Sequence, residues 1–313
     1  MEDKLIRERL EKRLGRTHAR QRIGIEAEHE AHVFGEGVRF FHIENWHSIH
    51  GLIRGSLKMV GLYRRAQSNA HNISVVYQNL SVPRLPKALN GIRILHLSDL
   101  HIDMNEKIVG CIIEKIKDIQ IDLCVLTGDY RYRTYGATEA VIKGMAHLFD
   151  YIHCPTYAVL GNHDSVKMLP EFEDMGIRVL MNEHIIEDRD SELLYIAGID
   201  DAHFFGVHNI EKAFEGIPSN GCILLLSHTP EIYRQAAHAG ANVFLCGHTH
   251  GGQICLPGGY PLTLDANIPR KFGRGLWEYS GMIGYTSPGA GSSIVDARLN
   301  CRPEITVHTL TNS

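Results

Sequence analysis

The stretch IRILHLSDLH, residues 92–101, joins a short apolar run to side chains that bind metals in many proteins. Residues 92–97 have the length and composition of a buried strand, and Asp99 and His101 follow directly. Four later apolar runs end in the same way, in short polar segments. These segments are TGD (127–129), GNHD (161–164), SH (227–228) and GHTH (247–250). The pattern predicts a sheet whose strand ends carry the chemistry.

Short apolar runs alternate with helix-like segments from about residue 72 to the carboxyl end. The candidate strands are residues 73–77, 92–97, 121–127, 156–160, 178–181, 193–199, 222–226, 242–246, 282–287 and 305–310. The candidate helices between them include residues 105–119, 138–149 and 230–239. Strands that alternate with helices predict an α/β domain with a largely parallel core.

The polar segments supply carboxylate, imidazole and amide groups but no cysteine. The candidate metal ligands are Asp99, His101, Asp129, Asn162, His228, His248 and His250. This set suits two hard or borderline divalent cations that activate water and bind a phosphate. Two close cations repel each other, so Asp129 is the natural candidate for a bridging carboxylate. In DLH and HTH, the i, i+2 spacing on an extended backbone would place both side chains on one side.

In this order, the motifs DxH, GD, GNHD, H and GHxH resemble the calcineurin-like metallophosphoesterase superfamily. The resemblance implies an α/β fold, a four-layer αββα sandwich of two mixed sheets with helices outside. It assigns Asp99, His101 and His250 to one metal, and Asn162, His228 and His248 to the other, with Asp129 between them. His163 would bind no metal. It would donate to the phosphate or protonate the leaving group, with Asp164 orienting its ring.

The flanking sequences HLSDLH, LTGDY, GHTHGGQICLP and CRPEITVHTL resemble the YkuE/YaeI-type branch, which includes a UDP-2,3-diacylglucosamine diphosphatase of lipid A synthesis. The likeness covers residues from about 81 to the carboxyl end. It implies a metal-dependent hydrolase of phosphoric esters or anhydrides, acting on a lipid- or nucleotide-linked diphosphate such as UDP-2,3-diacylglucosamine. Two divalent metal ions would be the cofactors, with Mn²⁺ preferred and Fe or Zn as alternatives.

Arg131 and Arg133 lie just beyond Asp129 and are candidates for binding the substrate. An arginine fork binds phosphate oxygens in a planar, bidentate way. Asn162 and His163 would also contact the substrate. The alternative for the arginines is a pair of charges that face solvent on a loop.

Residues 1–70 differ from the predicted catalytic domain, residues 71–313, and are expected to form an amino-terminal helical arm. Its two basic stretches, residues 1–21 and 40–65, carry apolar residues at helical spacing. These are Leu5, Ile6, Leu10 and Leu14 in the first, and Trp46, Ile49, Ile53, Leu57, Val60 and Tyr63 in the second. Such helices either lie on a membrane surface or pack on protein, and the lipid-associated branch favours the membrane.

Composition excludes some classes of protein. The 313 residues, 44% of them hydrophobic, can bury a large core, and a net charge of -4 argues against a nucleic-acid partner. The expected partner is a phosphorylated small molecule or lipid. Scattered cysteines without a CxxC pair or a signal peptide predict a cytoplasmic protein. The basic amino-terminal arm and the lipid-associated branch favour a peripheral position on the inner face of the membrane. A soluble cyclic-nucleotide or nucleic-acid phosphodiesterase, a phosphoprotein phosphatase and a catalytically silent metal-bound interaction module stay open as alternatives.

Overall fold

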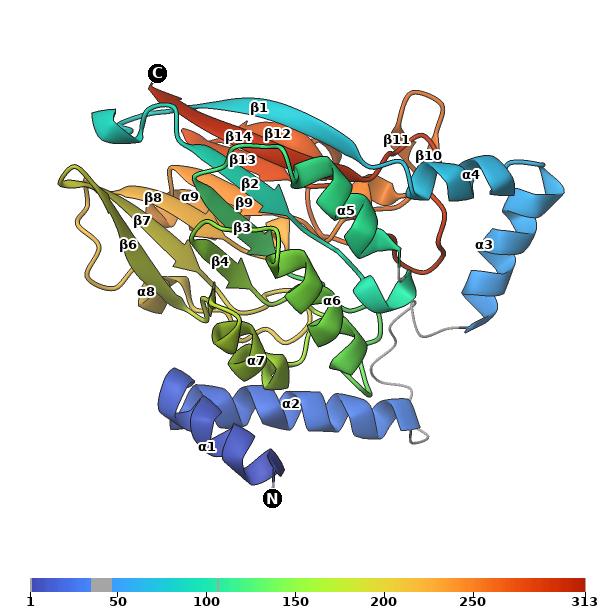
Figure 1. Ribbon diagram of the computed structural model, residues 1–313, viewed down its shortest axis with the longest axis horizontal. Helices are drawn as coiled ribbons and strands as arrows, with labels where there is room; N and C mark the ends of the chain where they lie inside the picture. Colours follow the sequence, from blue (N-terminus) through green and yellow to red (C-terminus); the bar gives the residue numbers. More distant parts are fainter. Residues whose placement is uncertain (1, 35–46, 106, 313) are drawn as a thin grey trace.

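The computed structural model describes residues 2–34, 47–105 and 107–312, and within them two six-stranded sheets lie face to face (Figure 1). The first sheet has the order β1-β14-β2-β3-β4-β5. Its strands are β1 (Ser74–Val82), β2 (Arg93–Leu97), β3 (Leu123–Thr127), β4 (Thr156–Val159), β5 (Ile177–Val179) and β14 (Glu304–Asn312). The second has the order β12-β13-β9-β8-β7-β6. Its strands are β6 (Glu183–Arg189), β7 (Glu192–Gly198), β8 (Cys222–Leu226), β9 (Val243–Cys246), β12 (Gly275–Tyr279) and β13 (Met282–Thr286).

The centre of each sheet is parallel. Strands β2 to β5 pair in parallel in the first sheet, as do β7, β8, β9 and β13 in the second. Antiparallel partners join them, namely β14 beside β2 and the edge strands β6 and β12. Every candidate strand overlaps one of these strands, so the prediction of a largely parallel core is confirmed.

Apolar side chains fill three layers. Between the sheets, Ile94 and Val125 of the first sheet belong to the same buried cluster as Leu224 and Leu245 of the second. The helices α5 (Ile108–Ile116), α6 (Glu139–Phe149) and α7 (Leu169–Asp174) cover the outer face of the first sheet, and α9 (Tyr233–Ala239) and α8 (Ile210–Ala213) cover that of the second. Strands β3 and β8 are buried at every position because both of their faces are covered. The four-layer αββα sandwich is therefore confirmed.

The described residues of the amino-terminal region form four helices, α1 (Glu2–Leu14), α2 (Arg16–Phe34), α3 (His47–Met59) and α4 (Tyr63–Ala70). Leu10 and Leu14 of α1 join the core cluster on the outside of the first sheet, and Figure 1 shows α1 and α2 lying beside α7. Leu10 and Leu14 of the first predicted stretch therefore pack on protein, whereas its Leu5 is exposed. No helix of the described residues is long and apolar enough to cross a membrane.

Helices α3 and α4 lie away from α1 and α2, near the short hairpin of β10 (Cys255–Leu256) and β11 (Tyr260–Pro261) (Figure 1). Leu57 of α3 packs with Val295 and Leu299, while Val60, the residue after the helix, is exposed. Residues 40–46 of the second predicted stretch, including Trp46, lie outside the described residues.

Candidate metal centre

The loops that follow β2, β3, β4, β8 and β9 meet at one edge of the two sheets. Parallel strands end at the same edge, so side chains far apart in sequence come together there. The structure brings together every predicted ligand, namely Asp99, His101, Asp129, Asn162, His228, His248 and His250. Each of them is buried.

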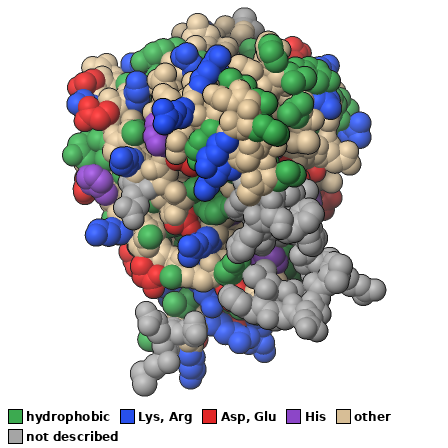
Figure 2. All heavy atoms as spheres, turned by 90° about the vertical axis from the view of Figure 1, so that its right-hand side faces the viewer, with side chains coloured by type: hydrophobic (Ala, Val, Ile, Leu, Met, Phe, Trp, Pro, Cys, Tyr) green, Lys and Arg blue, Asp and Glu red, His purple; other side chains and the backbone are tan. Residues whose placement is uncertain are grey.

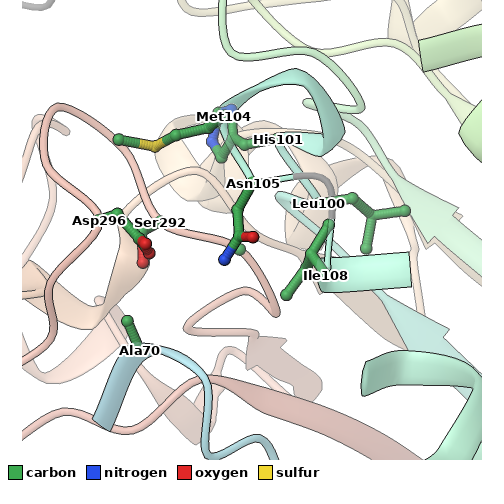
Figure 3. A pocket seen from close by; sticks show the side chains of 9 residues that line it. Ala70, Leu100, His101, Met104, Asn105, Ile108, Ser292 and Asp296 are labelled. Atoms are coloured by element: carbon green, nitrogen blue, oxygen red, sulfur yellow. The ribbon is translucent and has the colours of Figure 1, made fainter. Parts of the chain in front are cut away.

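The first group of ligand atoms comes from Asp99, His101 and His250, whose atoms lie within 4.8 Å of one another. Nε2 of His101 is 3.1 Å from Nε2 of His250, which is 3.5 Å from a carboxylate oxygen of Asp99. Figure 3 shows His101 from the side of a small pocket, where Met104 and Asn105 of its own loop lie opposite Ser292 and Asp296.

The second group comes from Asp129, His228 and His248, again within 4.8 Å. Nε2 of His228 is 3.2 Å from Nδ1 of His248 and 2.9 Å from the amide oxygen of Asn162. The carboxylate of Asp129 faces both groups, because its Oδ2 lies 3.3 Å from Nε2 of His228 and 3.8 Å from Nε2 of His101. This position is the one that a bridging carboxylate requires.

The donor chemistry fits a pair of divalent cations. Nδ1 of His101 is 2.9 Å from the carbonyl of Arg131, and Nδ1 of His228 is 2.7 Å from that of Thr127. A carbonyl only accepts, so Nδ1 carries a proton in both rings, and in the neutral form of each ring the Nε2 lone pair points into the cluster. Opposed imidazole nitrogens beside buried carboxylates have the composition of an N/O cation site.

The buried charges perturb one another. Burial raises the pKa of Asp99 to about 6. Burial opposes ionisation of Asp129 as well, but the imidazoles of His228 and His163 hold its pKa well below the ordinary value. The carboxylate of Asp129 in turn raises the pKa of His228 to about 10 against the effect of burial. Such a cluster concentrates charge where bound cations would compensate it.

The backbone at the ligands is strained. The φ angles are 51° at Asp99, 43° at His101, 56° at Asp129, 71° at His248 and 49° at His250, all in the left-handed region. Non-glycine residues there cost of order 1–3 kcal/mol each and cluster at functional sites. The expectation of an extended backbone through DLH and HTH is therefore wrong. The strands end at Leu97 and Cys246, and the chain turns sharply beyond them.

Two glycines allow the loops to approach this closely. A Cβ atom at Gly161 would lie 2.2 Å from Oδ1 of Asp129, and one at Gly247 would lie 1.9 Å from the hydroxyl of Ser98. A larger residue at either position would displace a ligand loop.

His163 lies beside the cluster, with Nε2 3.9 Å from Oδ2 of Asp129. The carbonyl of Tyr132 accepts from its Nδ1. The predicted contact of Asp164 with this ring is corrected by the structure. The Asp164 carboxylate instead accepts backbone N–H groups of Asp129 at 2.7 Å, Gly161 at 2.8 Å and Tyr130 at 2.9 Å, because it is buried beneath the loops and not beside the ring.

The two arginines after Asp129 have different surroundings. Arg131 is buried and donates to the carbonyls of Tyr135 and Gly136 at 2.7 and 3.1 Å, so its guanidinium holds its own loop. Arg133 is exposed. Substrate binding by either residue stays a prediction, and for Arg131 these contacts weigh against it.

Sequence reasoning missed two residues at the centre. Arg298 is fully buried, lies 3.1 Å from Nδ1 of His250 and donates to the carbonyl of Pro288 at 2.7 Å. The ring of His203 lies 4.2 Å from that of His248, centroid to centroid, and its Nδ1 bonds to Glu231 at 2.8 Å. Neither residue belongs to a motif, and the sequence contains no signal that would have identified them.

An apolar cleft opens beside His248 and His250, with a volume of about 280 Å³. Its apolar lining comes from α3, from the segments around β10 and β11, and from the loop before β14. The apolar lining residues are Ile53, Ile254, Leu262, Ile294 and Val295, and the polar side chains of Thr249, Gln253, Thr263, Asp265 and Ser293 also line the cleft. The cleft therefore leads from one histidine of each group of predicted ligands to the amino-terminal region.

Comparison with known proteins identifies the family. The sequence model described as calcineurin-like phosphoesterase matches residues 92–252, which hold every predicted ligand. The chain belongs to the calcineurin-like phosphoesterase family. Members of this family are metal-dependent phosphoester hydrolases, so the predicted superfamily and enzyme class are confirmed.

Three relatives show the range of the likeness. A zebrafish protein named "Transmembrane protein with metallophosphoesterase domain" is 30% identical to this chain. The matched region covers 82% of this chain but only 60% of the zebrafish protein. YkoQ of Bacillus subtilis, an uncharacterized metallophosphoesterase, is 30% identical over 81% of this chain and 96% of its own length. The UDP-2,3-diacylglucosamine pyrophosphatase LpxG of Chlamydia trachomatis is 24% identical over 59% of this chain and 71% of its own. YkuE and YaeI also match, which confirms the predicted branch.

Proposed function

We propose that this protein is a dinuclear metal hydrolase that cleaves the phosphoric anhydride of an acylated, nucleotide-linked substrate of the UDP-2,3-diacylglucosamine type. The observation that carries the proposal is the apolar cleft that starts at His248 and His250 and ends at α3. A cleft with this lining suits acyl chains, whereas a soluble ester or a phosphoprotein would be better served by a polar groove. The name of LpxG gives independent support.

In this proposal, one cation would be held by Asp99, His101 and His250 and the other by Asn162, His228 and His248, and Asp129 would serve both. Mn²⁺ is the preferred metal, and Fe and Zn also suit the N/O donor set. When bound, the pair supplies Lewis acidity toward the phosphate and activation of water.

The chain's own contribution to proton transfer falls to His163. The Tyr132 carbonyl fixes its ring through Nδ1, which leaves Nε2 directed toward the cluster, 3.9 Å from Asp129. When the ring carries a proton on both nitrogens, Nε2 can donate a hydrogen bond from this position to a phosphate oxygen, or pass its proton to the leaving group.

Helix α3 is the proposed contact with a membrane surface. Its Ile53 lines the cleft, while Leu52 and Met59, 68% and 83% exposed, project from the helix together with the basic residues Arg54 and Lys58. Figure 2 shows the side of the molecule on which α3 and α4 lie, where basic and apolar side chains are interspersed. Exposed apolar residues among basic ones favour a surface of anionic lipid, such as the inner face of a membrane.

Hydrolysis assays with matched variants test the proposal. With Mn²⁺, the wild type should hydrolyse UDP-2,3-diacylglucosamine faster than its counterpart without acyl chains, and Asp129→Ala should abolish both reactions. Leu262→Asp places a charge in the cleft and should raise KM for the acylated substrate at least tenfold. The control is Leu276→Asp, since Leu276 is 50% exposed, like Leu262 at 53%, but lies on β12 outside the cleft. The lipid assignment would be ruled out if the two variants had the same KM and if the acylated and non-acylated substrates also had the same KM.

A further inference from the structure

We infer that α2 belongs to the catalytic apparatus, because its Arg22 and Glu26 position the loop that carries His163. The inference rests on the proposed hydrolytic function but not on the nature of the substrate. The residues of the loop concerned are 161–166, and those of α2 lie some 140 residues earlier in the chain.

Arg22 is fully buried between α2 and two loops of the catalytic domain. Its Nη2 donates to the backbone carbonyl of Asp164 at 2.9 Å. Its Nε lies 3.4 Å from the buried carboxylate of Asp200, and the guanidinium carbon lies 3.1 Å from the centroid of the Phe205 ring. One side chain thus joins the residue after His163 to the loop that follows β7.

Glu26, one helical turn later, holds the next two residues of the same loop. One carboxylate oxygen accepts from the hydroxyl of Ser165 at 2.6 Å and the other from the N–H of Val166 at 2.7 Å. Glu26 also pairs with Nη1 of Arg22 at 3.2 Å. These two side chains of α2 therefore bind three consecutive residues, Asp164 to Val166.

The opposite side of the loop is held by the Asp164 carboxylate, which accepts N–H groups from Gly161 and from the loop of Asp129. The loop is consequently fixed between the Asp129 loop and α2. Asn162 and His163 lie between these attachments. A shift of the loop would move the ring of His163 relative to the substrate, and catalytic geometry tolerates little displacement.

A contribution to stability does not by itself explain why a buried arginine occupies position 22. A fully buried arginine loses its hydration, and an interface with apolar residues in place of both Arg22 and its partner Asp200 would be at least as stable. The same helical region has other attachments that avoid the catalytic loop, such as Arg13 of α1, which pairs with Glu173 and Glu183. Arg22 is distinguished from them by its bond to the main chain beside His163.

Steady-state kinetics on aryl phosphodiesters of graded leaving-group pKa test this role. We expect Arg22→Ala to retain the metal content of the wild type and its KM, and to lower kcat about 10- to 100-fold. The loss should grow as the leaving group becomes poorer, because proton donation by His163 matters most there. Millimolar guanidinium should restore part of kcat, and Arg22→Lys should fall between the two. The control, Arg13→Ala, should lower Tm and leave kcat unchanged.

Two results would overturn the inference. One is a folded Arg22→Ala protein with wild-type kcat for every leaving group. The other is a loss of kcat in both Arg22→Ala and Arg13→Ala that is proportional to the loss of Tm, with the same proportion in the two variants. If Arg22→Ala does not fold, the variants Arg22→Lys and Glu26→Gln test the inference instead. Wild-type kcat and wild-type leaving-group dependence in both variants would show that Arg22 and Glu26 do not position the loop of His163. The aryl esters carry no acyl chain, so this test stands even if the lipid assignment fails.

Discussion

Replacing Gly161 by alanine tests how tightly the ligand loops pack. The added Cβ would lie 2.2 Å from Oδ1 of Asp129 and 2.7 Å from its backbone nitrogen. Ordinary contacts between non-bonded heavy atoms are about 3.5 Å, so the carboxylate must move by roughly 1 Å. A misplacement of this size costs about 100-fold in rate, or about 2.7 kcal/mol of barrier.

We therefore expect Gly161→Ala to hydrolyse bis-p-nitrophenyl phosphate about 100-fold more slowly than the wild type and to bind Mn²⁺ more weakly by titration calorimetry. The matched control is Gly110→Ala in α5, where an added Cβ would meet nothing within 4 Å. That variant should keep full activity and gain about 1 kcal/mol of stability, because alanine favours helix over glycine. Wild-type rate and Mn²⁺ affinity in Gly161→Ala would refute the reasoning.

Three further results are expected. Burial lowers the pKa of His96 to about 3 and that of His308 well below its usual range. As the pH is lowered below about 6.5, the unfolded state therefore binds protons that the folded state does not, and the free energy of unfolding decreases. At pH 5 the loss that His96 causes should be about 2 kcal/mol by urea denaturation, and unchanged pH dependence in a His96→Gln variant would contradict this. Leu10→Ala should cost about 3 kcal/mol, since Leu10 is fully buried, and a loss below about 0.5 kcal/mol would mean that α1 does not pack on the core. Mn²⁺ at 100 times its Kd should stabilise the apoprotein by about 2.7 kcal/mol, whereas an unchanged Tm on chelation would contradict a metal site.

The central strands could be predicted from the sequence. Segments such as β3 and β8 are covered on both faces and read as continuous apolar runs, and those runs are closed by the polar segments of the site. The edge strands β6 and β12 could not be predicted in this way. The sequence of β6, EHIIEDR, is mostly polar because one face and one edge meet solvent, and its partner β7 supplies the pairing.

The positions of the predicted ligands followed from topology, but their local geometry did not. Strand-end loops converge because the strands are parallel, and that much is contained in the motif order. The left-handed backbone at Asp99 and His248 depends on contacts between loops far apart in sequence, such as the N–H of His248 with the Asp99 carboxylate at 3.1 Å. The role of Asp164 was misjudged for the same reason, since its partners lie on two different loops.

The amino-terminal region was the least predictable part. Leu10 and Leu14 gave an apolar stripe that fits a membrane surface as well as a protein surface, and periodicity does not distinguish the two. The decisive features of α2 are polar, Arg22 and Glu26, and in the sequence they look like two charges on a solvated helix. Only the fold brings them to the catalytic loop.

The most direct test of the central claim is anomalous X-ray diffraction from crystals grown with Mn²⁺. The account predicts two peaks roughly 3.5–4 Å apart, one next to Asp99, His101 and His250 and the other next to Asn162, His228 and His248, with Asp129 between them. A single peak, or peaks away from these side chains, would contradict it.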